Sequence, residues 1–289
     1  MTEHLHPRVA ALLDLPIAER VNNHWTKIWI DYPKAGDLLE EMVGLRDAPP
    51  QHRPRNILLF GTTGNGKSGL LWEFAKQNLP FEAPGHDYLQ FPVLRIETPS
   101  KPDEGRFWTE ILNQLQIMHR VTANSARKEE LALKAMKGAG VKLLILDEIH
   151  NVLTGSYNQQ RLFMTIIKRT SNMLGIPIVA AGTEDAKNVL QYDGQLASRF
   201  RMEELPDWQL NNEFLDLLGT FEVLIPLRNR SSLTNSDLAT DLHVMSRGIL
   251  GELSEILRQA TIAAIKDKSE QITRATLKKI KWKPPGSKK

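Results

Sequence analysis

A glycine-rich loop between an apolar run and a helix pattern constrains this chain more than any other feature. The almost wholly apolar run Asn56–Phe60 suits a strand that is buried on both faces, and Lys67–Asn78 has the pattern of a helix. The loop that joins them is Gly61-Thr62-Thr63-Gly64-Asn65-Gly66-Lys67-Ser68. Strand, loop and helix in this order are the context of a phosphate-binding P-loop, so the motif predicts a nucleotide site in an α/β fold.

The loop also predicts how a nucleoside triphosphate is held. Gly61, Gly64 and Gly66 allow the backbone to curl until successive N–H groups point at phosphate oxygens, and the start of the next helix favours the anion. We expect Lys67 to reach the β- and γ-phosphates and the Ser68 hydroxyl to ligate Mg²⁺. ATP and Mg²⁺ are therefore the expected cofactors, and residues 61–68 the ATP-binding segment.

Short apolar strands alternate with helix patterns as far as residue 200. We expect strands at Phe91–Glu97, Lys142–Leu146 and Ile176–Ala181, and helices at Glu104–Met118, Ala126–Lys137 and Gln159–Leu174. This alternation predicts βαβ units, and hence a parallel sheet with helices on both faces.

The pattern after residue 206 is mostly helical, with candidates at Leu210–Phe221, Asn235–Ser246, Leu250–Lys266 and Thr273–Ile280. We therefore expect four parts. Residues 1–54 lead into the nucleotide site and include a helix at Lys34–Leu45. Residues 55–205 form the P-loop core, residues 206–280 a small helical domain, and residues 281–289 a flexible basic tail.

Two adjacent carboxylates follow the apolar strand that ends at Leu146. Asp147 and Glu148 come at its carboxyl end, the edge at which parallel sheets bind ligands. Asp147 is expected to hold Mg²⁺, and Glu148 to polarise the attacking water. A strand end that is merely capped by acids is the alternative, but an upstream P-loop favours the catalytic interpretation.

Two further polar groups are candidates for the same chemistry. Thr183 follows a buried strand and could place the lytic water, although it could also simply cap the next helix. Arg199 and Arg201 could complete a neighbouring subunit's site as an arginine finger, or be ordinary surface residues. His150 is interpreted as a local hydrogen-bonding residue.

Composition narrows the cellular setting. The chain has no cysteine, which suits a reducing cytosol, and it has neither a signal-peptide pattern nor an apolar stretch of membrane-spanning length. Residues 266–289 hold nine Lys or Arg against two Asp or Glu, whereas the remainder holds 28 basic and 32 acidic residues. This basic end could contact nucleic acid or an acidic partner, or could only aid solubility.

The motifs together resemble the AAA+ ATPases, and in more detail residues 20–265 resemble the TniB family, which is related to the TnsC proteins of Tn7-like elements. The resemblance lies in these stretches: Trp29–Ala35, Asn65–Ser68, Pro102–Phe107, Asp147–His150, Gln160–Phe163, Gly182-Thr183, Leu196–Phe200, Leu205-Pro206, Glu222–Arg228 and Gly248–Leu253. It implies a sheet of order 5-1-4-3-2, a helical lid, and Trp29 and Tyr32 near the adenine.

The resemblance also implies a function. Such proteins polymerise on double-stranded DNA as rings or helical filaments when ATP is bound. They recruit a DDE transposase of the TniA or TnsB kind, cooperate with a TniQ-like target selector, and disassemble on hydrolysis, all in the bacterial cytoplasm. One departure is Glu252, which stands where relatives can carry a γ-phosphate-sensing arginine; Arg247 or Arg258 could substitute for it.

In an assembled ring or spiral, helix N-termini and Lys or Arg side chains that face the bore would bind DNA phosphates without reading bases. The candidates cluster after the second strand: Lys101, Arg106, Arg120, Thr122, Ser125, Arg127 and Lys128. Each could instead be a solvated surface residue. Two rival functions remain open, an IstB-like or initiator-like helicase loader and a nucleotide switch that does not hydrolyse; Glu148 argues against the switch.

Overall fold

The computed structural model describes residues 3–20, 29–85, 89–190 and 194–283. They form two compact units. The α/β unit comprises residues 34–63 and 67–205, and the helical unit comprises residues 1–33, 64–66 and 206–289. Residues 1–54, expected as one segment, thus divide between the two units at Pro33. Among the described residues, no helix is both long enough and apolar enough to cross a membrane.

A five-stranded sheet is the framework of the α/β unit. Its strands are β1 (Asn56–Phe60), β2 (Val93–Glu97), β3 (Leu143–Asp147), β4 (Ile178–Gly182) and β5 (Phe200–Glu204). Neighbouring strands run parallel in the order β2-β3-β4-β1-β5, which confirms the expected 5-1-4-3-2 arrangement. Every residue of β1, β3 and β4 is buried, as their apolar sequences predict.

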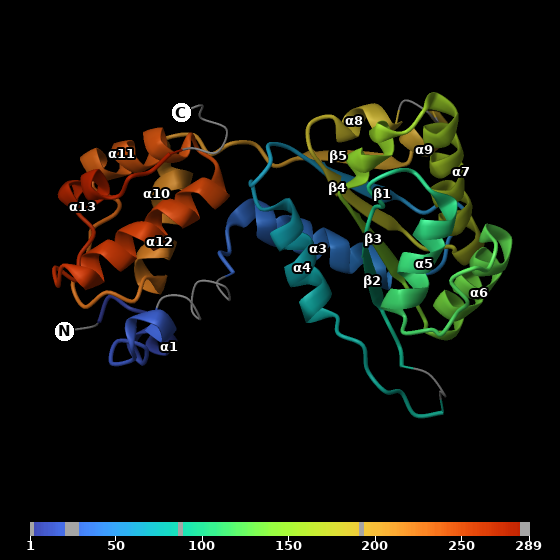
Figure 1. Cartoon of the computed structure of the whole chain (residues 1–289), viewed down its shortest axis with the longest axis horizontal. Helices are drawn as coiled ribbons and strands as arrows, with labels where there is room; N and C mark the ends of the chain where they lie inside the picture. Colours follow the sequence, from blue (N-terminus) through green and yellow to red (C-terminus); the bar gives the residue numbers. More distant parts are fainter. Residues whose placement is uncertain (1–2, 21–28, 86–88, 191–193, 284–289) are drawn as a thin grey trace. The chain divides into compact units, whose positions relative to one another are not determined.

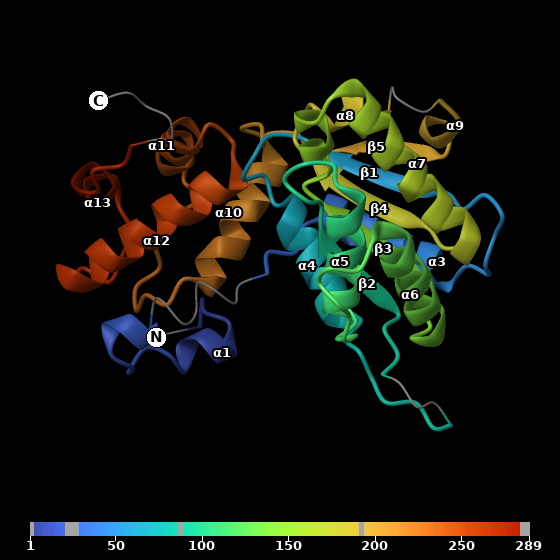
Figure 2. The ribbon, with the colours of Figure 1, turned by 45° about the vertical axis from the view of Figure 1, so that its right-hand side comes forward.

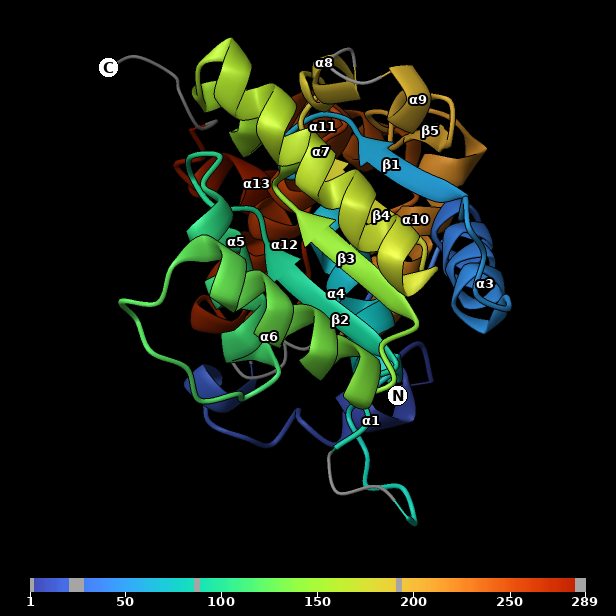
Figure 3. The same ribbon diagram turned by 90° about the vertical axis from the view of Figure 1, so that its right-hand side faces the viewer.

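Helices cover both faces of this sheet (Figure 3). One face packs on α5 (Glu104–Gln114), α6 (Ser125–Gly138) and α7 (Tyr157–Leu174) in a single hydrophobic cluster. The other face carries α3 (Pro33–Asp47) and α4 (Lys67–Gln77), which bury Leu38, Met42, Leu70 and Phe74. Short connections complete the unit: η1 (Ile149–Thr154), α8 (Ala186–Val189) and α9 (Gly194–Ala197).

One expected helix is shorter than its pattern suggested. The helix expected at Glu104–Met118 ends at Gln114, and Gln116 adopts a positive φ of 58°, which no helix continues. Met118 is 96% exposed. The apolar residues beyond Gln114 therefore belong to a loop that leads into α6.

The helical unit packs four helices around its own core (Figures 1 and 2). These are α10 (Asn212–Leu224), α11 (Ser236–Ser246), α12 (Leu250–Lys266) and α13 (Arg274–Lys279). The N-terminal residues, including α1 (Pro7–Ala10), fold onto the same unit, where Leu5, Val9 and Leu13 cluster beside Leu224. Trp282 also packs against this core and donates its indole N–H to the carbonyl of Met245 at 3.2 Å.

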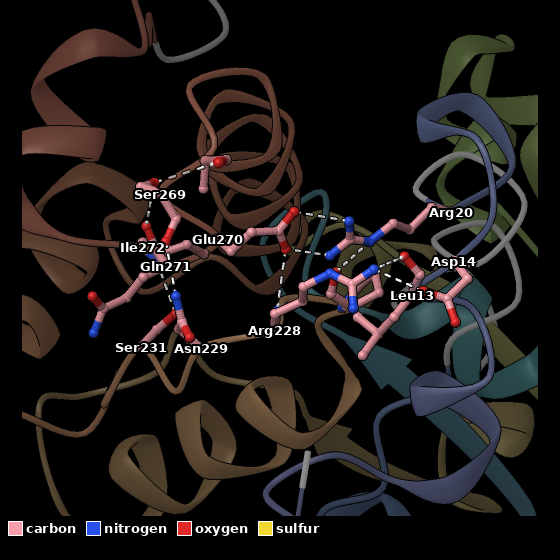
Figure 4. A network of polar contacts seen from close by, with 12 residues as sticks. Leu13, Asp14, Arg20, Arg228, Asn229, Ser231, Ser269, Glu270, Gln271 and Ile272 are labelled. Carbon is pink, nitrogen blue, oxygen red and sulfur yellow. Dashed lines mark hydrogen bonds and ion pairs between the residues drawn. The ribbon is translucent and has the colours of Figure 1, made fainter. Parts of the chain in front are cut away.

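Ion pairs tie the N-terminal residues to this unit (Figure 4). Arg20 is 4% exposed, forms a two-pronged pair with the Glu270 carboxylate, and donates to the carbonyl of Pro226 at 2.8 Å. Arg228 pairs with Asp14 at 2.7 Å. Because a buried guanidinium is costly unless it is paired, Arg20 fixes where this segment lies on the unit.

Candidate functional site

The P-loop of the α/β unit leaves β1 through a turn that only glycine can make. Gly61 has a φ of +145°, and a Cβ on it would lie 2.4 Å from the carbonyl oxygen of Leu205. This closeness follows from the pairing of β1 with β5, since Leu205 N–H donates to the carbonyl of Phe60 at 2.9 Å. The loop is therefore anchored at the carboxyl edge of the sheet.

Lys67 opens α4 and points back into the loop. Its side chain is 7% exposed, and its Nζ donates to the carbonyls of Gly61 at 2.7 Å and Thr62 at 2.8 Å. A buried ammonium held against loop carbonyls is a compact positive charge inside the loop. The contact of Lys67 with the β- and γ-phosphates stays a prediction.

The tip of the loop, Gly64–Gly66, belongs to the helical unit. Gly64 accepts a hydrogen bond from the N–H of Gly251 at 2.9 Å. The Asn65 amide donates to the carbonyl of Pro206 at 2.6 Å and accepts from the N–H of Leu250 at 3.3 Å. The segment 248–252 that the sequence singled out therefore contacts the loop tip through its backbone.

Asp147 ends β3 beside the start of α4. Its Oδ1 accepts from the Ser68 hydroxyl at 3.1 Å and from the N–H of Glu148 at 3.0 Å, and its Oδ2 pairs with Arg95 at 2.8 Å. The Asp147 side chain is 5% exposed. Arg95 lies on β2, and sequence reasoning missed it; a charged residue inside the apolar run 93–96 was the only signal for it.

A hydroxyl and a carboxylate in contact suit Mg²⁺, which binds proteins through one or two oxygen ligands and completes its shell with phosphates and water. Ser68 and Asp147 supply these two oxygens. Among the described residues no group of three His, Cys, Asp or Glu could hold a metal ion, so an all-protein metal cage is not found there. The residues present therefore fit a magnesium ion that is shared with a nucleotide.

Glu148 follows in a strained conformation. Its φ of 55° and ψ of 39° lie in the left-handed region, which costs a non-glycine residue about 1 kcal/mol or more. Its carboxylate is 3.2 Å from Nε2 of His150. Strain of this kind is retained where the surrounding structure requires a side chain to point in one direction.

Thr183 follows β4, the strand next to β3. Its backbone N–H donates to Nδ1 of His150 at 3.3 Å. The next helix, α8, has Asp185 and not Thr183 as its N-cap. The structure therefore gathers Lys67, Ser68, Asp147, Glu148 and Thr183 at the carboxyl edge of β1, β3 and β4.

The two arginine-finger candidates lie near the amino-terminal ends of the strands, where β5 begins, and the P-loop lies at the carboxyl ends. Arg199 donates to the Asn172 side chain at 2.6 Å. Arg201 is exposed and pairs with Glu41 at 2.9 Å and with Glu203. The hydrogen bond from Arg201 to Glu203 raises the pKa of the arginine. Neither arginine joins the P-loop group of its own chain.

Of the two aromatic candidates for the adenine site, Tyr32 has the more defined contacts. It packs edge-to-face on Trp208, with ring centroids 5.1 Å apart, and burial raises the pKa of its hydroxyl to about 12. Trp29 is partly buried in the same unit.

Of the two arginines that could sense the γ-phosphate, Arg258 pairs with Glu255 at 2.7 Å and Arg247 is exposed.

The DNA candidates gather where α5 and α6 begin side by side. Asp103 caps α5 and Asn124 caps α6, and Ser125 Oγ lies 3.3 Å from where a Cβ on Gly105 would be. The loop between the helices and the first turns of α6 enclose an open hollow of about 760 Å³, lined by Met118, His119, Arg120, Thr122, Ala123, Asn124, Arg127, Lys128 and Leu131.

Most of these candidates are accessible. The exposed ones are Lys101, Arg106, Arg120, Thr122 and Arg127. Ser125 is partly buried, and Arg127 pairs with Glu130 at 2.6 Å. Lys128 differs from the expectation of a surface residue: it is 8% exposed and donates to the Thr109 hydroxyl at 3.1 Å, because the α5–α6 packing covers it.

The parallel sheet of order 5-1-4-3-2, the P-loop after its first strand and the helical C-terminal region define the chain as an AAA+ protein by fold. The Aeropyrum pernix ORC2 protein, solved in ADPNP-ADP complexes, matches with a TM-score of 0.63 at 12% identity over 90% of this chain and 71% of that one. The A. pernix ORC1 protein in complex with DNA gives 0.61 at 15% identity over 90% and 68%.

Cdc6p from Pyrobaculum aerophilum gives a TM-score of 0.64 at 16% identity over 87% of this chain and 68% of that one. At the level of sequence, the family described as "Bacterial TniB protein" matches residues 20–210, so this chain belongs to the TniB family. No curated protein matches it.

Proposed function

We propose that this protein is an ATPase that regulates DNA transposition. It polymerises on double-stranded DNA when ATP is bound, recruits a DDE transposase, works with a TniQ-like target selector, and leaves the DNA after hydrolysis. The observation that carries this proposal is the meeting of Lys67, Ser68, Asp147 and Glu148 at one edge of the sheet in a chain of the TniB family.

The contacts of these residues support the roles that we propose for them. Lys67 neutralises charge on the β- and γ-phosphates, and Ser68 with Asp147 would hold Mg²⁺, which supplies charge stabilisation to the transferring phosphoryl group. Glu148 orients and polarises the attacking water, and Thr183 helps to place it. Trp29 and Tyr32 lie near the adenine.

Either Arg199 or Arg201 acts on a neighbouring chain as the arginine finger. Both lie where β5 begins, whereas the P-loop leaves the far end of β1, its parallel neighbour. Residues at opposite ends of the strands in one sheet cannot contribute to the same site within one chain. They can meet across the interface between two chains in a ring or a filament. Which of the two is the finger can be tested by mixing Arg199→Ala or Arg201→Ala chains with Lys67→Ala chains and measuring restored hydrolysis.

DNA binds at the starts of α5 and α6. Two helix N-termini present backbone N–H groups, and Lys101, Arg106, Arg120, Thr122, Ser125 and Arg127 surround them. The ORC1 protein of this fold was solved with DNA, which supports a nucleic-acid role for the architecture. Of the acids beside these starts, Asp103 caps α5, Glu129 pairs with Arg169 and Glu130 pairs with Arg127, while Glu104 lies in the first turn of α5.

The central test is nucleotide-dependent DNA binding. A non-hydrolysable ATP analogue should promote binding that strengthens with DNA length and weakens with salt. Replacing Arg120 and Arg127 by Gln should lower the slope of log K against log salt by about 0.9 for each DNA phosphate that the variant no longer neutralises. Lys137→Gln, at the far end of α6, is the matched control and should change nothing. Analogue-independent binding would contradict the proposal.

Hydrolysis is tested by Glu148→Gln, which keeps the size of the side chain and removes its charge. This substitution should abolish phosphate release and trap chains on DNA with ATP bound, whereas Lys67→Ala should lose ATP binding itself. Phosphate release that Glu148→Gln leaves unchanged would favour a nucleotide switch that does not hydrolyse. Pull-down of the purified transposase and TniQ-like protein by the trapped, DNA-bound chain tests the partners.

Similarity of fold to ORC and Cdc6 proteins favours a second candidate, an initiator-like or IstB-like helicase loader. A strand-displacement assay with a replicative helicase separates the two. A loader should stimulate unwinding in that assay, whereas a transposition regulator should stimulate only strand transfer by the transposase.

A further inference from the structure

His150 lies between two residues of the candidate site. Its Nε2 is 3.2 Å from Oε2 of Glu148, and its Nδ1 accepts from the backbone N–H of Thr183 at 3.3 Å. These two contacts join the ends of β3 and β4 through one imidazole ring.

The contact with Thr183 determines which ring nitrogen carries the proton. A backbone N–H can only donate, so Nδ1 must offer its lone pair. In the neutral ring the hydrogen then resides on Nε2, which faces Glu148. His150 is therefore a donor to the carboxylate and an acceptor from the strand end at the same time.

The backbone is adapted to this arrangement. A Cβ on Gly182, the last residue of β4, would lie 3.2 Å from Nδ1 of His150 and 2.8 Å from Cβ of Ala186. Any larger residue would push the ring away from the strand. On the other side, Glu148, whose carboxylate contacts the ring, has a left-handed backbone conformation.

We propose that His150 is the positioning residue of Glu148: its imidazole binds one carboxylate oxygen and fixes it relative to the end of β4. This inference rests on the proposed ATPase activity. By engaging Oε2, His150 leaves Oε1 of Glu148 for the attacking water, and it makes the direction of that oxygen depend on Thr183.

Two substitutions separate the contacts of His150. In His150→Asn the side-chain oxygen can replace Nδ1 as the acceptor for Thr183, but no donor reaches Glu148. In His150→Gln the amide nitrogen can replace Nε2 as the donor to Glu148. We expect His150→Asn to lower kcat for ATP hydrolysis roughly tenfold, the effect of removing one orienting hydrogen bond, with the KM for ATP unchanged. His150→Gln should recover part of the rate, because it restores the donor to Glu148 but not the acceptor for Thr183.

A second measurement does not depend on turnover. Imidazole ¹⁵N spectra of the full-length protein should show His150 with its hydrogen on Nε2, and Glu148→Gln should shift the Nε2 signal while leaving the melting temperature unchanged. A hydrogen on Nδ1, an Asn variant as active as the wild type, or a Gln variant no better than Asn would each overturn the inference. If the wild type hydrolyses no ATP, the proposed function fails, and the spectra still test the contact between His150 and Glu148.

Discussion

Arg95 illustrates how one side chain can both stabilise the fold and adjust the site. It is the cation that balances Asp147, whose side chain is 5% exposed. Its own side chain is about one third exposed, so water screens part of the interaction. Sequence patterns do not predict such a pair, because its two members come from strands that are far apart along the chain.

Arg95→Met should lower the free energy of unfolding by about 1–3 kcal/mol, since it leaves the Asp147 charge without its partner. Mg²⁺ with ADP should restore more of this stability in the variant than it adds to the wild type, because the ion can take the place of the guanidinium. Urea denaturation with and without Mg²⁺-ADP measures both effects. Arg127→Met, which breaks an exposed pair, is the control and should stay within about 0.5 kcal/mol.

Glu270 makes stability depend on acid pH. Burial acts to raise the pKa of its carboxyl, but the hydrogen bonds from Arg20 and from the N–H of Arg228 outweigh burial and lower it. A carboxyl whose pKa is lower in the folded state stabilises the protein above its ordinary pKa, and this stabilisation disappears as pH falls through the lowered value. Glu270→Gln should therefore cost about 2 kcal/mol at neutral pH and nothing in strong acid.

Denaturation of the wild type and Glu270→Gln across the acid range measures this difference. The control is Glu130→Gln, whose partner Arg127 is exposed. A constant gap between Glu270→Gln and the wild type at every pH would show that Glu270 contributes by packing and not by charge.

The loop that connects β1 to α4 shows how an element depends on its neighbours. Gly61→Ala should destabilise the protein by more than about 1 kcal/mol and abolish ATP binding, because its Cβ would collide with the carbonyl of Leu205 at a φ that alanine avoids. Gly69→Ala in α4 meets nothing within 4 Å and should stabilise the helix by up to about 1 kcal/mol. Thermal melts and equilibrium binding of a fluorescent ATP analogue compare the two.

The basic tail, residues 281–289, is tested by two truncations, because its first residues pack on the helical unit and its last residues do not belong to the described part of the chain. Trp282 packs on the helical unit, so truncation after Ile280 should lower the stability of that unit even in the absence of any partner. Residues 284–289 lie outside the described part of the chain; we propose that they dock the transposase or another partner. Truncation after Lys283 should leave the melting temperature unchanged and weaken transposase recruitment in a pull-down. Unchanged recruitment would contradict docking by the tail.

At the scale of the whole molecule, each of the two units has a hydrophobic core of its own among the described residues. One lies between the sheet and its helices, and the other within α10–α13. Hydrogen exchange should therefore give distinct opening free energies for the two sets of peptides. A bound ATP analogue should slow exchange in residues 61–68 and in β3, since a ligand stabilises the state that binds it. Equal opening free energies in both units would show that they unfold as one.

Much of the fold could be predicted because its signals are local. The apolar runs of β1, β3 and β4 are buried throughout, and the sheet covers them on both faces as their composition requires. β5 could not be found from its pattern, since Phe200–Glu204 carries three charged residues and forms an edge strand with one neighbour. The end of α5 was missed because apolar residues continue into the loop.

The sequence by itself determined the P-loop, the paired carboxylates at the end of β3 and the helical C-terminal region, because each depends on residues that are close together along the chain. Only the tertiary structure decided that Arg95 balances Asp147, that His150 joins Glu148 to Thr183, and that the loop tip packs with the residues around Pro206 and Gly251. These contacts cross between strands or between distant segments. The distances in these contacts depend on how the backbone folds, so the spacing of the residues along the chain does not predict them.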